Sequence, residues 1–128
     1  MPFVLRRQVE LALGRDRMGR FRSDVEAWLL ASFPERCRDL EETRFRSLAN
    51  RGIDAAARAG MRSAYARRRI AACNVLLGTD VLAGKAWPAI ANCAASDAPE
   101  AERAETCMQI AIGLTEWRSA VLCGEQTS

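Results

Sequence analysis

Carboxylates are the side chains of this sequence best suited to act as general acids or bases near neutral pH, because its 128 residues include no histidine. They cluster as Glu41 with Glu42 and as Glu100, Glu102 and Glu105. Both clusters lie where a helix is predicted to begin, and acidic side chains at that end compensate the helix dipole. Neither stretch indicates the burial that raises a carboxyl pKa. We therefore predict no catalytic residue and expect a protein that is not an enzyme.

Five cysteines offer thiol chemistry, but their spacing does not fit a metal site. No C-x-x-C pair occurs and histidine is absent, so we predict neither a metal nor a cofactor. An odd number of cysteines in a chain without an apolar signal segment favours reduced thiols and a cytoplasmic location. Cys73 and Cys107 fall at apolar helical positions, where thiols behave as small hydrophobic residues. No apolar run reaches 18 residues, so no membrane partner is expected.

Arginine supplies 18 of the 19 basic residues and is concentrated early in the chain. Residues 1–69 hold 16 Arg against 9 acidic residues, whereas residues 70–128 carry a net charge of −4. Guanidinium groups suit paired binding to carboxylates, although arginine runs also occur on solvated faces or reflect a compositional bias. Consecutive helical positions point in different directions, so neighbouring arginines cannot all face one partner. The predicted partner-binding residues are the densest basic group: Arg51, Arg58, Arg62, Arg67, Arg68 and Arg69.

The elements that carry these residues are predicted to be helices. Hydrophobic periodicity is helical along almost the whole chain, without the sustained alternation typical of strands. We expect an all-α fold in which residues 1–128 form a single domain, a compact bundle of five or six helices. The expected helices cover about residues 5–13, a continuation to 32 after a bend at Gly14 or Gly19, 34–38, 41–59, 64–77, 88–95 and 99–123.

Prolines, glycines and one serine mark the expected boundaries. Pro34 ends one helix and opens the next, since the residue before a proline leaves helical space. Gly60 and Gly78 are typical left-handed caps, and Gly124 is expected to end the last helix. Ser63 is expected to cap the helix that follows it.

Two helix faces predict packing. The helix at 41–59 is lined by small residues that would let another helix approach closely: Ala49, Gly52, Ile53 and Ala56. The last helix places apolar residues at heptad spacing across two heptads: Cys107, Ile110, Leu114, Trp117 and Val121. Two heptads are fewer than a coiled coil needs, so this helix is either the centre of the bundle, which we prefer, or a dimer face. We expect Trp28, Trp87 and Trp117 to lie in the core.

One stretch of the chain resembles a known family. The residues that carry the resemblance are Phe33-Pro34-Glu35-Arg36-Cys37, Leu48, Arg51-Gly52-Ile53 with Ala55 and Ala56, Gly60-Met61, Leu76-Leu77-Gly78 and Ala86-Trp87-Pro88. They are similar to a family of small helical proteins encoded in bacterial type VI secretion clusters beside effectors, their loading chaperones and PAAR tip proteins. The chain departs from the family pattern at Val81, where an aromatic residue is usual, and in the order of Trp87 and Pro88.

The resemblance implies a cytoplasmic accessory protein, a co-adaptor that acts beside a dedicated chaperone when a toxin is loaded onto the secretion tip, and it implies no catalysis. The expected partner is therefore a protein, either the effector chaperone or the effector itself, with a homodimer as a further possibility. An immunity protein that blocks a cognate toxin is the alternative function. A basic nucleic-acid-binding protein is a third, less favoured because nine acidic residues are interspersed among the arginines and few aromatic side chains are present for stacking.

Overall fold

The computed structural model describes the backbone of residues 2–83 and 86–127 and the side chains of residues 17–83 and 86–118. Six helices make up the fold, and the described residues contain no strand, which confirms the all-α bundle. The helices are α1 (Pro2–Ser32), α2 (Pro34–Asp39), α3 (Glu42–Arg58), α4 (Ala64–Leu77), α5 (Pro88–Ala94) and α6 (Glu100–Thr127).

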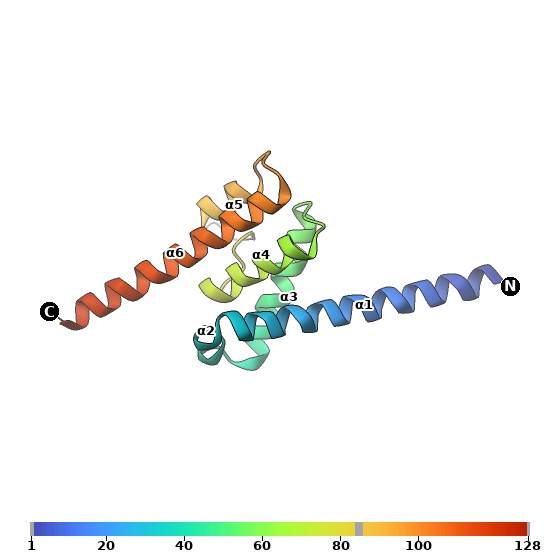
Figure 1. Ribbon diagram of the computed structural model, residues 1–128, viewed down its shortest axis with the longest axis horizontal. Coiled ribbons are helices and arrows are strands. Elements are labelled where there is room, and N and C mark those ends of the chain that lie inside the picture. The colour runs from blue at the N-terminus through green and yellow to red at the C-terminus, as the bar shows by residue number, and fades with distance from the viewer. Residues whose placement is uncertain (1, 84–85, 128) are drawn as a thin grey trace.

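Helix α4 is the centre of the bundle. It packs against α3 on one side and α6 on the other, and α5 packs on α6 (Figure 1). All residues from Ile70 to Leu77 are buried, because small side chains such as Ala71 and Cys73 let neighbouring helices approach from both sides. The prediction that residues 99–123 form the central helix is therefore wrong. Helix α6 lies to one side of α4 and extends past its end (Figure 1).

The core has two parts, one on each side of α4. One part lies among α1, α2, α3 and α4 and includes Val25, Leu29 and Ile53. The other lies mainly among α4, α5 and α6 and includes Ile90 and Cys107. Each of the two longest helices covers one part and projects beyond it, and the projecting ends of α1 and α6 point in opposite directions (Figure 1).

The contact between α3 and α4 is close enough to require glycine. A Cβ atom placed on Gly52 would lie 2.6 Å from the Cα of Ala71 and 3.0 Å from its backbone nitrogen. Next to this contact, the fully buried side chain of Asn74 donates a hydrogen bond to the carbonyl of Leu48 (3.0 Å) and accepts one from the backbone N–H of Val81 (3.0 Å). The predicted close packing of the small-residue face is confirmed.

Most of the predicted boundaries are confirmed. Helix α2 starts at Pro34, and Gly60 and Gly78 have left-handed φ angles of 85° and 70°. The Ser63 hydroxyl accepts a hydrogen bond from the Ala66 N–H at 3.1 Å and so caps α4.

A break between two helices was expected at Gly14 or Gly19, and the end of the last helix was expected at Gly124, but neither occurs. Helix α1 continues through Gly14 and Gly19, and α6 continues through Gly124. A glycine inside a helix costs about 1 kcal/mol relative to alanine, which weakens a helix without breaking it.

Candidate protein-binding surfaces

The six arginines predicted to bind a partner do not form one surface. Arg67, Arg68 and Arg69 are half-buried on α4, and each contacts other parts of the fold. In contrast, Arg51 and Arg58 on α3 and Arg62 in the following connection are exposed. The structure thus divides the predicted site into a group that supports the fold and a group that faces outward.

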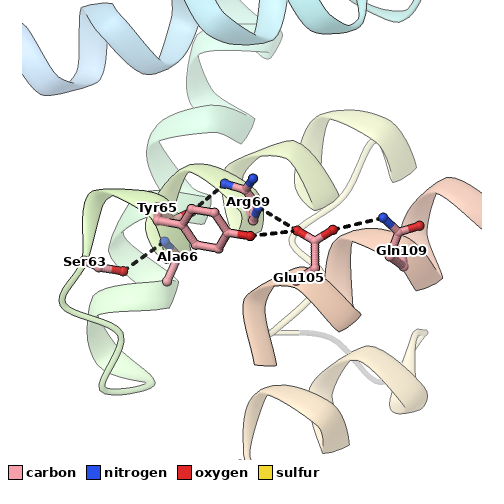
Figure 2. A network of polar contacts seen from close by, with 6 residues as sticks. All are labelled: Ser63, Tyr65, Ala66, Arg69, Glu105 and Gln109. Atoms are coloured by element: carbon pink, nitrogen blue, oxygen red, sulfur yellow. Dashed lines mark hydrogen bonds and ion pairs between the residues drawn. The ribbon is translucent and has the colours of Figure 1, made fainter. Parts of the chain in front are cut away.

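Arg69 belongs to a network that joins α4 to α6. Its Nε donates to Oε2 of Glu105 at 2.8 Å, and the hydroxyl of Tyr65 donates to the same oxygen at 3.1 Å. Gln109 donates to the other carboxylate oxygen at 3.0 Å. Figure 2 shows these side chains converging on Glu105, and the Arg69 guanidinium lies 3.4 Å from the centroid of the Tyr65 ring. The hydrogen bonds from Arg69 and Gln109 hold the pKa of Glu105 below its usual value.

A second carboxylate of the predicted acidic cluster also links α4 to α6. Glu100, in the first turn of α6, accepts a hydrogen bond from the backbone N–H of Ser63 at 2.7 Å. This bond is the main reason why the pKa of Glu100 is lowered. On α3, Glu42 pairs instead with Arg46 four residues later, at 2.9 Å. The contacts of Glu42, Glu100 and Glu105 therefore give these carboxylates structural roles at helix ends and between helices.

The other two arginines of α4 contact different parts of the fold. Arg67 donates from Nε to the Met61 carbonyl at 2.9 Å, which closes the connection between α3 and α4. Arg68 lies over the Trp28 ring of α1, 4.7 Å from its centroid, in a cation–π arrangement. Trp28 in turn meets Phe33 edge to face, with ring centroids 6.2 Å apart. The Arg69 guanidinium also lies 6.0 Å from the Trp28 centroid, whereas Arg67 turns to Met61, which confirms the expectation that the three consecutive arginines cannot all face one partner.

Arg51 and Arg58 are seven residues apart on α3 and therefore share one face of the helix, two turns apart. Asp54 lies between them in the sequence, but its carboxylate accepts a hydrogen bond from Arg22 of α1 at 2.8 Å. Arg22 also donates to the Asn50 side chain at 3.1 Å. Within the described part of the chain, neither Arg51, Arg58 nor Arg62 forms an ion pair or a side-chain hydrogen bond. Their charges remain available to another molecule.

A groove of about 520 Å³ lies between α2, the end of α4, the start of α5 and the outer part of α6. Its apolar lining consists of Leu76, Leu77, Trp87, Leu114 and Trp117. Its polar lining comprises Glu35, Arg36, Asp39, Thr115 and Arg118. This groove was not predicted, because its walls come from four segments that only the fold brings together.

The three tryptophans occupy different environments. Trp28 and Trp87 are half-buried against the two parts of the core, in partial agreement with prediction. Trp117 was expected in the core, but 66% of it is exposed. Its heptad position is apolar in pattern, yet it lies at the edge of the groove, where the bundle leaves most of its side chain uncovered. Trp117 belongs to the heptad face for which a dimer interface was the alternative prediction, and it lies exposed at the groove.

Two of the thiols occupy the buried apolar positions that were predicted for them. Cys73 and Cys107 are buried and free, and burial raises the pKa of both. For Cys107, burial and the nearby Cys93 thiol raise the pKa to about 12. Across the described residues, no three His, Cys, Asp or Glu side chains are grouped to hold a metal ion. Cys123 lies outside the described side chains.

No protein-family model, curated protein or solved structure matches this chain. Within the helical segments that are described, none combines the length and apolar character that crossing a membrane requires. The described residues offer two candidate contact surfaces: exposed arginines on and just after α3, and a groove of mixed apolar and charged lining beside α6.

Proposed function

We propose that this protein is a non-enzymatic, protein-binding accessory factor that acts in the cytoplasm and assists the loading of a type VI secretion effector. The observation that carries the binding role is that Arg51 and Arg58 share one face of α3 and that both, together with Arg62 in the following connection, are exposed. These three residues form the proposed arginine face. The sequence resemblance supplies the biological setting, with the effector chaperone or the effector as the partner.

The arginine face is well placed to recognise an acidic protein surface. Helix α3 is fixed from behind by the Gly52–Ala71 contact and by the bond from Asn74 to Leu48, so Arg51 and Arg58 project from a rigid support. Guanidinium groups form paired hydrogen bonds with carboxylates. At an exposed rim such charges set orientation and association rate more than affinity, and salt weakens them.

A protein partner fits the charge arrangement better than nucleic acid does. Several arginines of the basic half are engaged within the fold: Arg22 by Asp54, Arg69 by Glu105, and Arg36 by the carbonyl of Val75. The excess positive charge of residues 1–69 is therefore divided among inner contacts and small outer groups. A limited group of three arginines suits a local acidic patch rather than a continuous phosphate backbone.

The proposal is tested by co-expressing the full chain with the effector and the loading chaperone encoded beside it and purifying the complex. The test variant carries Arg51→Gln, Arg58→Gln and Arg62→Gln. A matched control removes the same charge from exposed arginines elsewhere, with Arg17→Gln, Arg20→Gln and Arg38→Gln. We expect the test variant to lower the association rate for the partner about tenfold or more at low salt. The control should bind like the wild type, and both variants should unfold at the wild-type temperature.

Four results would contradict the proposal. If neither chaperone nor effector co-purifies, or if the two triple variants bind equally well, the arginine face is not the partner site. If the protein alone protects cells from the neighbouring toxin, it is an immunity protein. Retention on duplex DNA or RNA, with affinity falling steeply as salt rises, would instead indicate nucleic-acid binding.

A further inference from the structure

We propose that the groove beside α6 and the exposed Trp117 together form a self-complementary interface, across which α6 packs against α6 of a second copy in a two-fold symmetric dimer. This inference does not depend on the proposed accessory function, since it uses a surface other than the arginine face. It concerns the part of α6 that lies past the end of α4 (Figure 1).

The apolar groups of this surface include both a projecting side chain and a place to receive one. Trp117 is 66% exposed, whereas Leu76, Leu77 and Trp87 line the groove next to it. A volume of about 520 Å³ is within the range of pockets that take drug-sized ligands, and it accommodates an indole ring. A two-fold axis near Leu114 and Trp117 would place each indole in the groove of the other copy, because such an axis makes every contact occur twice.

The charged groups at the rim are complementary in the same way. Glu35 and Asp39 lie on the α2 side of the groove together with Arg36, whose Nε donates to the Val75 carbonyl at 3.0 Å. Arg118 lies on the α6 side next to Trp117. Within the described residues, no ion pair joins Arg118 to either carboxylate. In an antiparallel crossing, each Arg118 comes opposite the carboxylates of the other copy. A second copy is therefore preferred over an unrelated helix, because this chain supplies both the acidic and the basic partner.

The chain exposes more surface than a compact molecule of its mass does. The accessible surface is 8544 Å² for a chain of 14.1 kDa. A compact monomer of that mass is expected to expose about 6,700 Å². Helices α1 and α6 both project from the body, so only part of the excess of about 1,800 Å² lies beside the groove (Figure 1).

The test is the mass of the full chain in solution, measured by sedimentation equilibrium from about 1 μM to 1 mM. We expect the wild type to reach twice the chain mass in this range. Trp117→Ala should raise the dissociation constant at least about 30-fold, as expected for a central aromatic anchor. The matched control is Leu30→Ala, since Leu30 is another large apolar side chain that is half exposed, on α1 away from the groove. The control should dimerise like the wild type, and circular dichroism should show both variants folded.

Charge reversal separates a specific interface from general stickiness. Arg118→Glu should weaken the dimer, and adding Glu35→Arg and Asp39→Arg to the same chain should restore it. Three outcomes would overturn the proposal: a wild type that stays monomeric at 1 mM, a dimer that Trp117→Ala leaves unchanged, or a failure of the reversed charges to restore association. A monomeric wild type whose chaperone binding is lost in Trp117→Ala would assign the groove to a different protein.

Discussion

Replacing Gly52 with alanine tests whether the close approach of α3 to α4 holds the bundle together. In an open helix, this change would stabilise the protein by about 1 kcal/mol, because alanine has the higher helix propensity. Here the new Cβ would lie 2.6 Å from the Cα of Ala71. The obstacle is backbone, which cannot rotate away as a flexible side chain can. To reach an ordinary contact near 3.4 Å, the two helices would have to separate by about 0.8 Å.

The separation has a calculable cost. Overpacking a well-packed core destabilises by about 1–3 kcal/mol. The same movement stretches the bond from Asn74 to the Leu48 carbonyl, and a buried group left unpaired costs about 1–3 kcal/mol more. After the propensity gain is subtracted, we expect Gly52→Ala to lower the free energy of unfolding by about 1–5 kcal/mol. For a chain of this length, the midpoint of thermal unfolding should fall by about 10 °C.

The assay is thermal and urea unfolding followed by circular dichroism, with all variants at one protein concentration because self-association would shift the midpoint. Gly19→Ala is the matched control, since Gly19 is also helical and a Cβ there would meet nothing within 4 Å. The control should be stabilised by about 0.5–1 kcal/mol. If Gly52→Ala were stabilised to the same extent as Gly19→Ala, the contact would not be as tight as described and the reasoning would be refuted.

Three further changes have defined outcomes. Asn74→Ala removes the partners of a buried carbonyl and a buried N–H, so the free energy of unfolding in urea should fall by about 2–4 kcal/mol. Glu105→Gln should destabilise by less than about 1 kcal/mol at pH 7, because the carboxylate is partly exposed. Since the pKa of Glu105 is lowered in the fold, the stabilisation by its carboxylate is present above the usual pKa and is lost as the pH falls through the folded value. When unfolding is measured from pH 2 to 7, the free energies of unfolding of the wild type and Glu105→Gln should therefore converge at the acidic end. The pKa values of Cys73 and Cys107 are raised, so the pH dependence of stability has the opposite sign for these thiols. Their stabilisation is complete below the ordinary thiol pKa near 9 and is lost as the pH rises above it, by about 1.4 kcal/mol per pH unit for each thiol. In urea titrations, the stability of Cys107→Ala should therefore fall less steeply at alkaline pH than that of the wild type.

Helix boundaries could be predicted well where the signal acts within one turn. Pro34 restricts the residue before it, Gly60 and Gly78 adopt a backbone conformation that other residues rarely take, and Ser63 bonds to an N–H three residues away. Whether a helix continues through Gly14, Gly19 or Gly124 could not be predicted in the same way. A glycine inside a helix changes the balance by about 1 kcal/mol, and the rest of the helix then decides the outcome.

The candidate site was less predictable, because its contacts join distant parts of the chain. Arg69 pairs with a carboxylate 36 residues later, so no local pattern separates it from Arg62, which stays exposed. The exposure of Trp117 was also not predictable from the local pattern. Its heptad position predicts an apolar environment, but whether the bundle covers its side chain depends on how distant parts of the chain pack. The arginine face on α3 was predictable only in part, since Arg51 and Arg58 were singled out together with residues that turned out to support the fold.

The central position of α4 means that the two proposed surfaces share one mechanical support. Helix α3, which carries the arginine face, and α6, which carries Trp117, each make their largest contact with α4. A shift of α3 on partner binding would reach α6 through a helix that is buried from Ile70 to Leu77 and packed against both neighbours. Occupancy of one surface and assembly at the other would then be thermodynamically linked, and the linkage would act equally in both directions.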